Sequence, residues 1–79
     1  MTFYPDPAVD ALMAVWAAQL TVARQEAGMS QRALALVLGT TQGSVSNMEG
    51  LRWRPDVTTW THWAAVFDHE LILIKKEKR

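Results

Sequence analysis

The segment Thr41–Gly50 concentrates side chains that can read the edge of a nucleic-acid base. On a helical wheel, Val45 and Met48 point inward. The opposite side is small and polar, and consists of Gln42, Gly43, Ser44, Ser46, Asn47 and Gly50. Gln and Asn amides make paired hydrogen bonds to adenine N6 and N7 in the major groove, each giving about 1–3 kcal/mol of discrimination. The wheel alone fits a base-reading helix and an ordinary solvated outer face equally well.

Other side chains offer little chemistry. The absence of cysteine excludes disulfides and thiolate metal sites, and His62 and His69 do not have a metal-ligand spacing. We find no Ser/His/Asp set, no carboxylate pair and no Gly-rich phosphate loop between a strand and a helix. We therefore expect no enzyme, no metal and no cofactor. Trp53 lies between Arg52 and Arg54, where it either anchors a loop or contacts a DNA backbone or a partner.

Helix signals divide the chain into four short elements. The spacing predicts helices over about Pro7–Ala27, Gln31–Leu38 and Gln42–Glu49, and a fourth helix that begins after Asp56. Ser30, Thr41 and Asp56 suit N-caps, and Gly28, Gly39 and Gly50 suit C-caps. The expected inward residues are Val9, Leu12, Met13, Trp16, Leu20, Ala23 and Ala27, then Leu34, Ala35 and Leu38, and finally Trp60, Trp63, Ala64 and Phe67.

The apolar segment Leu71, Ile72, Leu73 and Ile74 follows the last expected helix. Its β-branched residues and lysine-rich end favour a strand, with an extension of the fourth helix as the alternative. Such a strand is apolar on both faces and would leave an exposed edge unless it pairs. We expect it to pair with its copy across a two-fold axis, which makes the protein a homodimer.

A longer motif connects these elements. It runs Leu20-x-x-x-Arg24-x-x-x-Gly28-Met29-Ser30-Gln31-x-x-Leu34-Ala35-x-x-x-Gly39-Thr40-Thr41-Gln42-x-Ser44-Val45-Ser46-Asn47-Met48-Glu49. This motif resembles the Cro/C1-type (XRE-like) helix-turn-helix family of phage repressors, and Glu70–Ile74 resembles the HipB-like antitoxin branch. The resemblance implies an all-α, compact four- to five-helix helix-turn-helix domain over residues 1–70. Residues 71–79 would form a short dimerising strand and a basic tail.

The family also implies roles for individual residues. Base-reading positions correspond to Gln42, Gly43, Ser46 and Asn47, although Gly43 lacks the side chain that many relatives use. Phosphate contacts correspond to Gln31, Arg32, Thr41, Ser44, Arg52 and Arg54. Arg24 and Glu49 correspond to a buried ion pair that joins the first helix to the third.

Charge and exposed apolar residues indicate the partners. The net charge is zero, but residues 1–50 carry −2 (two Arg, four acids) and residues 51–79 carry +2 (six Lys or Arg, four acids). We expect a homodimeric repressor that binds a pseudo-palindromic double-stranded DNA site. Leu36, Val37 and the outer face of the first helix leave a second hypothesis open, an antitoxin that also neutralises a kinase-like toxin. With no basic leader and no long apolar run, we expect a cytoplasmic protein without a membrane partner.

Overall fold

The computed structural model describes residues 7–71, and this part of the chain is all-helical. Its helices are α1 (Pro7–Glu26), α2 (Gln31–Leu38), α3 (Gln42–Glu49) and α4 (Val57–Val66). The predicted bounds of α2 and α3 are confirmed, and α1 ends one residue earlier than expected. Within residues 7–71, no helix has the length and apolarity needed to cross a lipid bilayer.

The predicted C-terminal strand is not seen where the chain is described. Leu71 is the last described residue, and it belongs to no strand or helix. Ile72, Leu73 and Ile74 lie outside the described residues, so the pairing expected of them stays a prediction.

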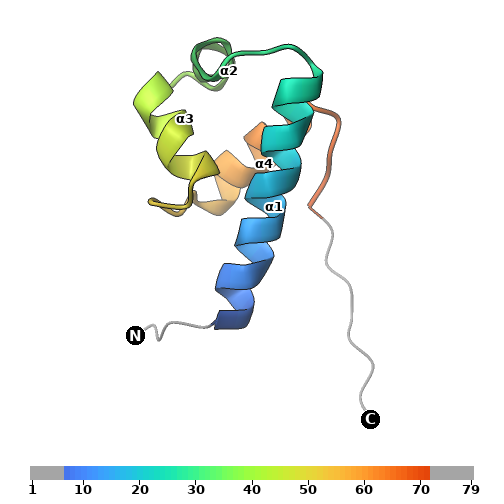
Figure 1. Cartoon of the computed structure of the whole chain (residues 1–79), viewed down its shortest axis with the longest axis vertical. Coiled ribbons are helices and arrows are strands. Elements are labelled where there is room, and N and C mark those ends of the chain that lie inside the picture. Colours follow the sequence, from blue (N-terminus) through green and yellow to red (C-terminus); the bar gives the residue numbers. More distant parts are fainter. Residues whose placement is uncertain (1–6, 72–79) are drawn as a thin grey trace.

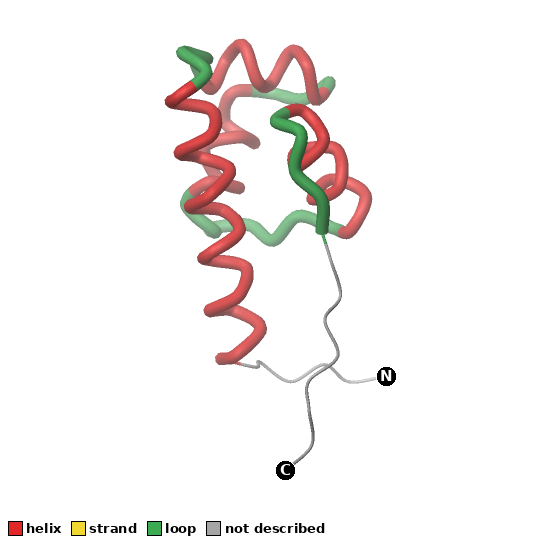
Figure 2. The backbone as a smooth tube through the Cα atoms, turned by 90° about the vertical axis from the view of Figure 1, so that its right-hand side faces the viewer, coloured by secondary structure: helices red, strands yellow, loops and turns green. Residues whose placement is uncertain are grey.

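The three shorter helices gather beside the C-terminal half of α1 (Figure 1). α2 packs against α3 and α4, and α3 also packs against α1. Figure 2 shows α1 from another side, with its first turns extending beyond the other helices. The core between the four helices consists of Met13, Ala17, Leu20, Leu34, Ala35, Val45, Met48, Trp60, Trp63 and Ala64.

The extension of α1 explains an error in the predicted core. Val9 and Leu12 were expected to face inward, but they are 46% and 49% exposed. Within residues 7–71, no other helix lies beside the first turns of α1. Periodicity alone therefore assigned Val9 and Leu12 to a core that the described residues do not form there. Further along the helix, Ala17 is 1% exposed and its small side chain permits a close helix contact.

Aromatic packing supports the junction of α1 and α4. The rings of Trp16 and Trp60 meet edge to face with centroids 5.5 Å apart. Trp60 in turn stacks on Trp63 at 5.3 Å. Trp60 and Trp63 are buried and Trp16 is partly buried, which confirms their predicted role in packing.

Side-chain caps fix where the last three helices begin. The Ser30 hydroxyl oxygen accepts a hydrogen bond from the Ala33 backbone N–H at 3.0 Å. Thr41 Oγ1 accepts from the Ser44 N–H at 3.1 Å, and Asp56 Oδ1 accepts from the Thr59 N–H at 2.8 Å. Each cap satisfies a backbone donor that the helix itself leaves without a partner.

Gly50 is the C-cap of α3, as predicted, and its φ is an ordinary −88°. The left-handed conformation falls on the next residue, Leu51, with φ of 50°. A left-handed conformation costs a non-glycine residue about 1–2 kcal/mol, and the packing of Leu51 against the core offsets this cost. The backbone conformation of Gly50 therefore does not itself require a glycine.

The Asp56 cap gives a pH-dependent contribution to stability. Hydrogen bonding from the Thr59 backbone N–H, then from its side chain, lowers the pKa of Asp56. A pKa that is lower in the folded state stabilises the fold above the unfolded value of about 3.9, and this stabilisation is lost as the pH falls through the folded value.

We expect Asp56→Asn to lower the acid sensitivity of the fold, because Asn caps a helix about as well as Asp without titrating. Thermal unfolding at about pH 7 and about pH 3 checks this. The variant should lose less melting temperature between the two pH values than the wild type. An equal loss in both proteins would contradict it.

Candidate nucleic-acid interface

A tight turn sets α3 across α2 and determines which side of α3 faces outward. Gly39 lies between the two helices with φ of 71°, and the Thr40 N–H donates to the Ala35 carbonyl at 2.9 Å. Val45 and Met48 are then buried at 0% and 1% exposure. The outward residues Gln42, Gly43 and Asn47 are exposed, whereas Ser44 and Ser46 are half-buried.

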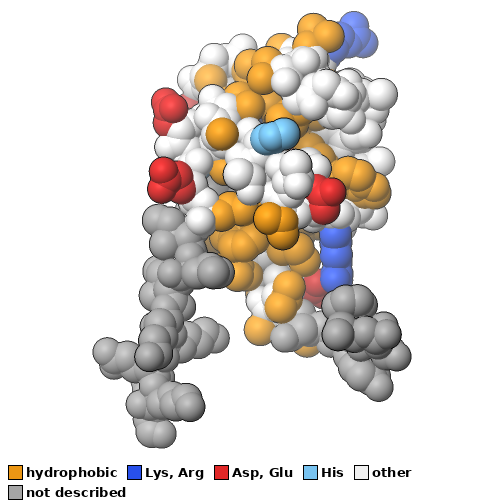
Figure 3. All heavy atoms as spheres, turned by 180° about the vertical axis from the view of Figure 1, so that it is seen from behind, with side chains coloured by type: hydrophobic (Ala, Val, Ile, Leu, Met, Phe, Trp, Pro, Cys, Tyr) orange, Lys and Arg blue, Asp and Glu red, His pale blue; other side chains and the backbone are white. Residues whose placement is uncertain are grey.

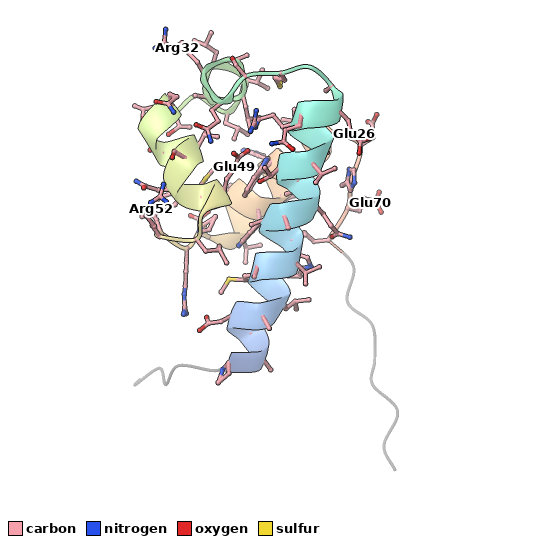
Figure 4. All side chains as sticks on the ribbon, viewed as in Figure 1. Glu26, Arg32, Glu49, Arg52 and Glu70 are labelled. Atoms are coloured by element: carbon pink, nitrogen blue, oxygen red, sulfur yellow. The ribbon has the colours of Figure 1, made fainter. Side chains whose placement is uncertain are left out.

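Arg24 and Glu49 form an ion pair between α1 and α3. Arg24 Nε lies 2.7 Å from Glu49 Oε2, and the two side chains are only 12% and 7% exposed. Arg24 Nη2 donates to Glu49 Oε1 at 3.2 Å, and Nη1 donates to the Met29 carbonyl at 2.8 Å. Figure 4 shows Glu49 in the space between α3 and α1. The pair therefore holds α3 and the α1–α2 junction in one arrangement.

The ion pair continues to the surface through two glutamines. Gln31 Nε2 donates to Glu49 Oε1 at 2.8 Å, and Gln42 Nε2 donates to Gln31 Oε1 at 2.7 Å. The sequence assigned Gln31 to phosphate and Gln42 to a base, but it did not indicate that the two amides bind each other. These bonds orient the Gln42 amide and leave its carbonyl oxygen available as an acceptor.

At the other end of α3, Arg52 binds the two remaining candidate readers. Arg52 Nε donates to Asn47 Oδ1 at 3.1 Å, and Nη2 donates to the Ser46 hydroxyl at 2.9 Å and to the Ser46 carbonyl at 3.1 Å. The guanidinium partly covers Ser46, which explains why this serine is half-buried rather than exposed. No local sequence signal distinguished Arg52 from Arg54.

The remaining predicted phosphate contacts fall into different environments. Arg32 is exposed, and its side chain points away from the body (Figure 4). The Thr41 hydroxyl donates to Ser44 Oγ at 3.0 Å, so both hydroxyls already serve the cap of α3. Arg54 pairs with Asp10 of α1, a contact that links the loop before α4 to the first helix. The structure thus places Arg32 and Arg52, rather than Arg54, beside α2 and α3.

Charge is unevenly distributed although the net charge is zero. In Figure 4, Arg32 and Arg52 lie on the side of α2 and α3, whereas Glu26 and Glu70 lie on the opposite side of α1. Seen from behind, the molecule shows carboxylates at one edge and also toward the other side, with hydrophobic side chains on the rear face between them (Figure 3). The face of α3 is therefore the better surface for a polyanion.

Gly43 is not required by packing. A Cβ at this position would meet only the Thr41 hydroxyl oxygen, at 3.9 Å, and Gly43 is exposed. Because the protein itself leaves room for a side chain there, the glycine suits the close approach of an external surface.

Comparison of the chain with protein-family models, with curated proteins and with solved structures gives no match.

We expect Glu49→Ala to destabilise the fold by about 3–5 kcal/mol, because it leaves the Arg24 guanidinium without its partner in a nearly buried place. Urea unfolding checks this. Glu26→Ala is the matched control, since Glu26 is exposed on α1 and should change stability by no more than about 0.5 kcal/mol. Equal effects of the two substitutions would contradict a structural role for the ion pair.

Proposed function

We propose that this protein is a sequence-specific regulator that binds double-stranded DNA as a homodimer and represses transcription. In this proposal α2 and α3 form a helix-turn-helix of the Cro/C1 type, and α3 enters the major groove. The resemblance of the motif Leu20–Glu49 to that family supports the proposal.

The observation that carries the proposal is the division of α3 into two faces. Val45 and Met48 are buried, while an amide, a glycine and a second amide are exposed at Gln42, Gly43 and Asn47. An α-helix with its side chains is about 10–12 Å across, which fits a major groove about 12 Å wide. Its amides are held by other side chains, which lowers the entropy cost of binding.

A homodimer follows from the same proposal. Two copies related by a two-fold axis would place two α3 helices about one DNA turn apart, on a pseudo-palindromic site. The exposed side of α1, with Val15 at 53% and Val22 at 48% exposure, adds apolar surface suited to an interface between subunits.

Selection of bound sequences from random duplexes tests the function, with the size of the complex measured in the same samples. We expect one pseudo-palindromic sequence to be enriched, with two protein chains on each duplex. Gln42→Ala and Asn47→Ala should each relax the preference at their own base positions by about 1–3 kcal/mol, because each removes a base contact.

The matched control for this selection is Gln25→Ala, a change of an exposed amide on α1 that lies outside the α2–α3 pair. It should leave both affinity and preference unchanged. Binding without any sequence preference, or a preference that survives both α3 substitutions, would contradict the proposal.

A second candidate function is an antitoxin, and the exposed apolar surface of α2 favours it. Leu36 is 80% exposed and Val37 57% exposed. These residues border a groove of about 530 Å³ that is also lined by His62, Ala65 and Val66. Large apolar side chains exposed next to one another are typical of protein-binding surfaces.

For this second function, we expect Leu36→Ser with Val37→Ser to abolish neutralisation of a toxin encoded by the neighbouring reading frame, because the apolar contact is lost. DNA binding should be unchanged, since Leu36 and Val37 are exposed residues of α2 that are not among the predicted DNA contacts. Co-expression with that neighbouring gene, with growth as the readout, checks this. Unaltered neutralisation by the double variant would exclude this surface as the toxin-binding site.

A further inference from the structure

Arg52 is bound to α3 through both its backbone and its side chain. The Arg52 backbone N–H donates to the Asn47 carbonyl at 3.0 Å, which follows from the left-handed conformation of Leu51. The chain therefore turns back over the end of α3, and the guanidinium reaches Ser46 and Asn47. Favourable interaction with the negative end of the helix dipole adds to these hydrogen bonds.

Gly50 leaves the space that this arrangement needs. A Cβ on Gly50 would lie 2.8 Å from Arg52 Nη1 and 3.3 Å from Cζ. The 2.8 Å distance is shorter than real Cβ contacts and the 3.3 Å distance is tighter than most, so an alanine would displace the flexible guanidinium. Since Gly50 has an ordinary φ of −88°, its backbone would accept alanine, and the closest obstacle is the guanidinium of Arg52.

The contact determines what Asn47 offers to an external partner. Arg52 Nε occupies Oδ1 of Asn47, and within residues 7–71 the Nδ2 group of Asn47 has no hydrogen-bond partner. Arg52 Nη1 lies over the exposed Gly50. The exposed end of α3 therefore presents N–H donors from two side chains, where a free Asn would present a donor and an acceptor.

Bases differ in how they match such a surface. Guanine offers two acceptors in the major groove, N7 and O6, whereas adenine offers the N7 acceptor beside the N6 donor. Arg52 Nε already uses one lone pair of Asn47 Oδ1. Paired recognition of adenine would need the other lone pair of the same oxygen, and it would bring the adenine amino group beside the guanidinium donors. A surface that presents hydrogen-bond donors therefore favours guanine, which offers two acceptors.

We propose that Arg52 is a specificity-determining residue, which positions the Asn47 amide so that the end of α3 selects guanine over adenine. The inference rests on the DNA-reading role proposed for α3. The inference gives Arg52 a role in specificity that Arg54 does not share, although the sequence predicted both as phosphate contacts.

Selection from random duplexes with matched variants tests this inference. The base position read by Asn47 is identified as the one whose preference is lost in Asn47→Ala. The wild type should prefer guanine there. Arg52→Lys keeps the positive charge but loses the planar fork with which Arg52 binds Asn47 and Ser46 together. Gly50→Ala keeps Arg52 itself while displacing its guanidinium. Both variants should lower the preference for guanine over adenine by about tenfold.

The controls separate positioning from charge. Arg54→Lys should leave the preference unchanged, because Arg54 contacts Asp10 and not α3. Neither Arg52→Lys nor Gly50→Ala alters net charge, so the salt dependence of nonspecific binding should match the wild type. Thermal unfolding of each variant establishes that the fold is retained, and Gly50→Ala tests the same contact as Arg52→Lys by an independent route.

The outcomes distinguish this inference from the function on which it depends. A wild-type chain that enriches no sequence would overturn the proposed function and this inference together. A wild-type chain that enriches a sequence with adenine under Asn47 would overturn the inference alone. So would an unchanged guanine preference in both Arg52→Lys and Gly50→Ala.

Discussion

The Arg24–Glu49 ion pair is the interaction on which the arrangement of α1, α2 and α3 depends. Both side chains are almost removed from water, and isolated charges in such places cost several kcal/mol each. The cost is offset because the Arg24 donors reach both carboxylate oxygens of Glu49 and the Met29 carbonyl. α3 can therefore sit on α1 in only one orientation without leaving a charge unpaired. In a chain this small, the ion pair supplies orientation that a thin apolar core does not.

The same pair connects stability to the candidate interface. Glu49 accepts hydrogen bonds from Arg24 and Gln31, and Gln31 accepts from Gln42. Arg24 binds the last residue of α3, Glu49, and is connected to the first, Gln42, through Gln31. Arg52 binds Ser46 and Asn47 directly. A substitution at Glu49 changes both the packing of α3 and the orientation of the Gln42 amide. Arg52, in contrast, is exposed and binds α3 outside the core, at the side chains of Ser46 and Asn47.

Local signals in the sequence predicted the helices well. Ser30, Thr41 and Asp56 each cap the helix that follows, because capping depends on one side chain and the backbone next to it. The burial of Val45 and Met48 followed from periodicity, which requires only that one face of α3 be covered. Both are properties of short segments, so they can be read from the order of residues.

Features that depend on the ends of elements or on distant contacts were not predictable in this way. Val9 and Leu12 have the spacing of core residues, but whether a neighbour covers them depends on the length of the other helices. The left-handed conformation falls on Leu51, directly after the predicted cap Gly50, and no local signal marks a leucine for it. Likewise, Asp10 lies far from Arg54 in the sequence, and nothing local relates them. The family resemblance supplied the Arg24–Glu49 pair, but it did not supply the bonds of Gln31 or Arg52.

The distribution of charge limits the affinity with which the surface of α2 and α3 could bind DNA. Nonspecific affinity for DNA rises with the number of phosphates that cations neutralise. The cations Arg32 and Arg52 are few for a DNA-binding surface. Arg52 is also shared with Asn47 and Ser46, which limits its freedom to follow a phosphate. A single copy would therefore bind any duplex weakly. Tight binding would require base contacts from α3 and a second copy on the same duplex, because a linked second contact multiplies affinity without additional charge. Near-neutral composition is then compatible with DNA recognition, provided that recognition is cooperative between subunits.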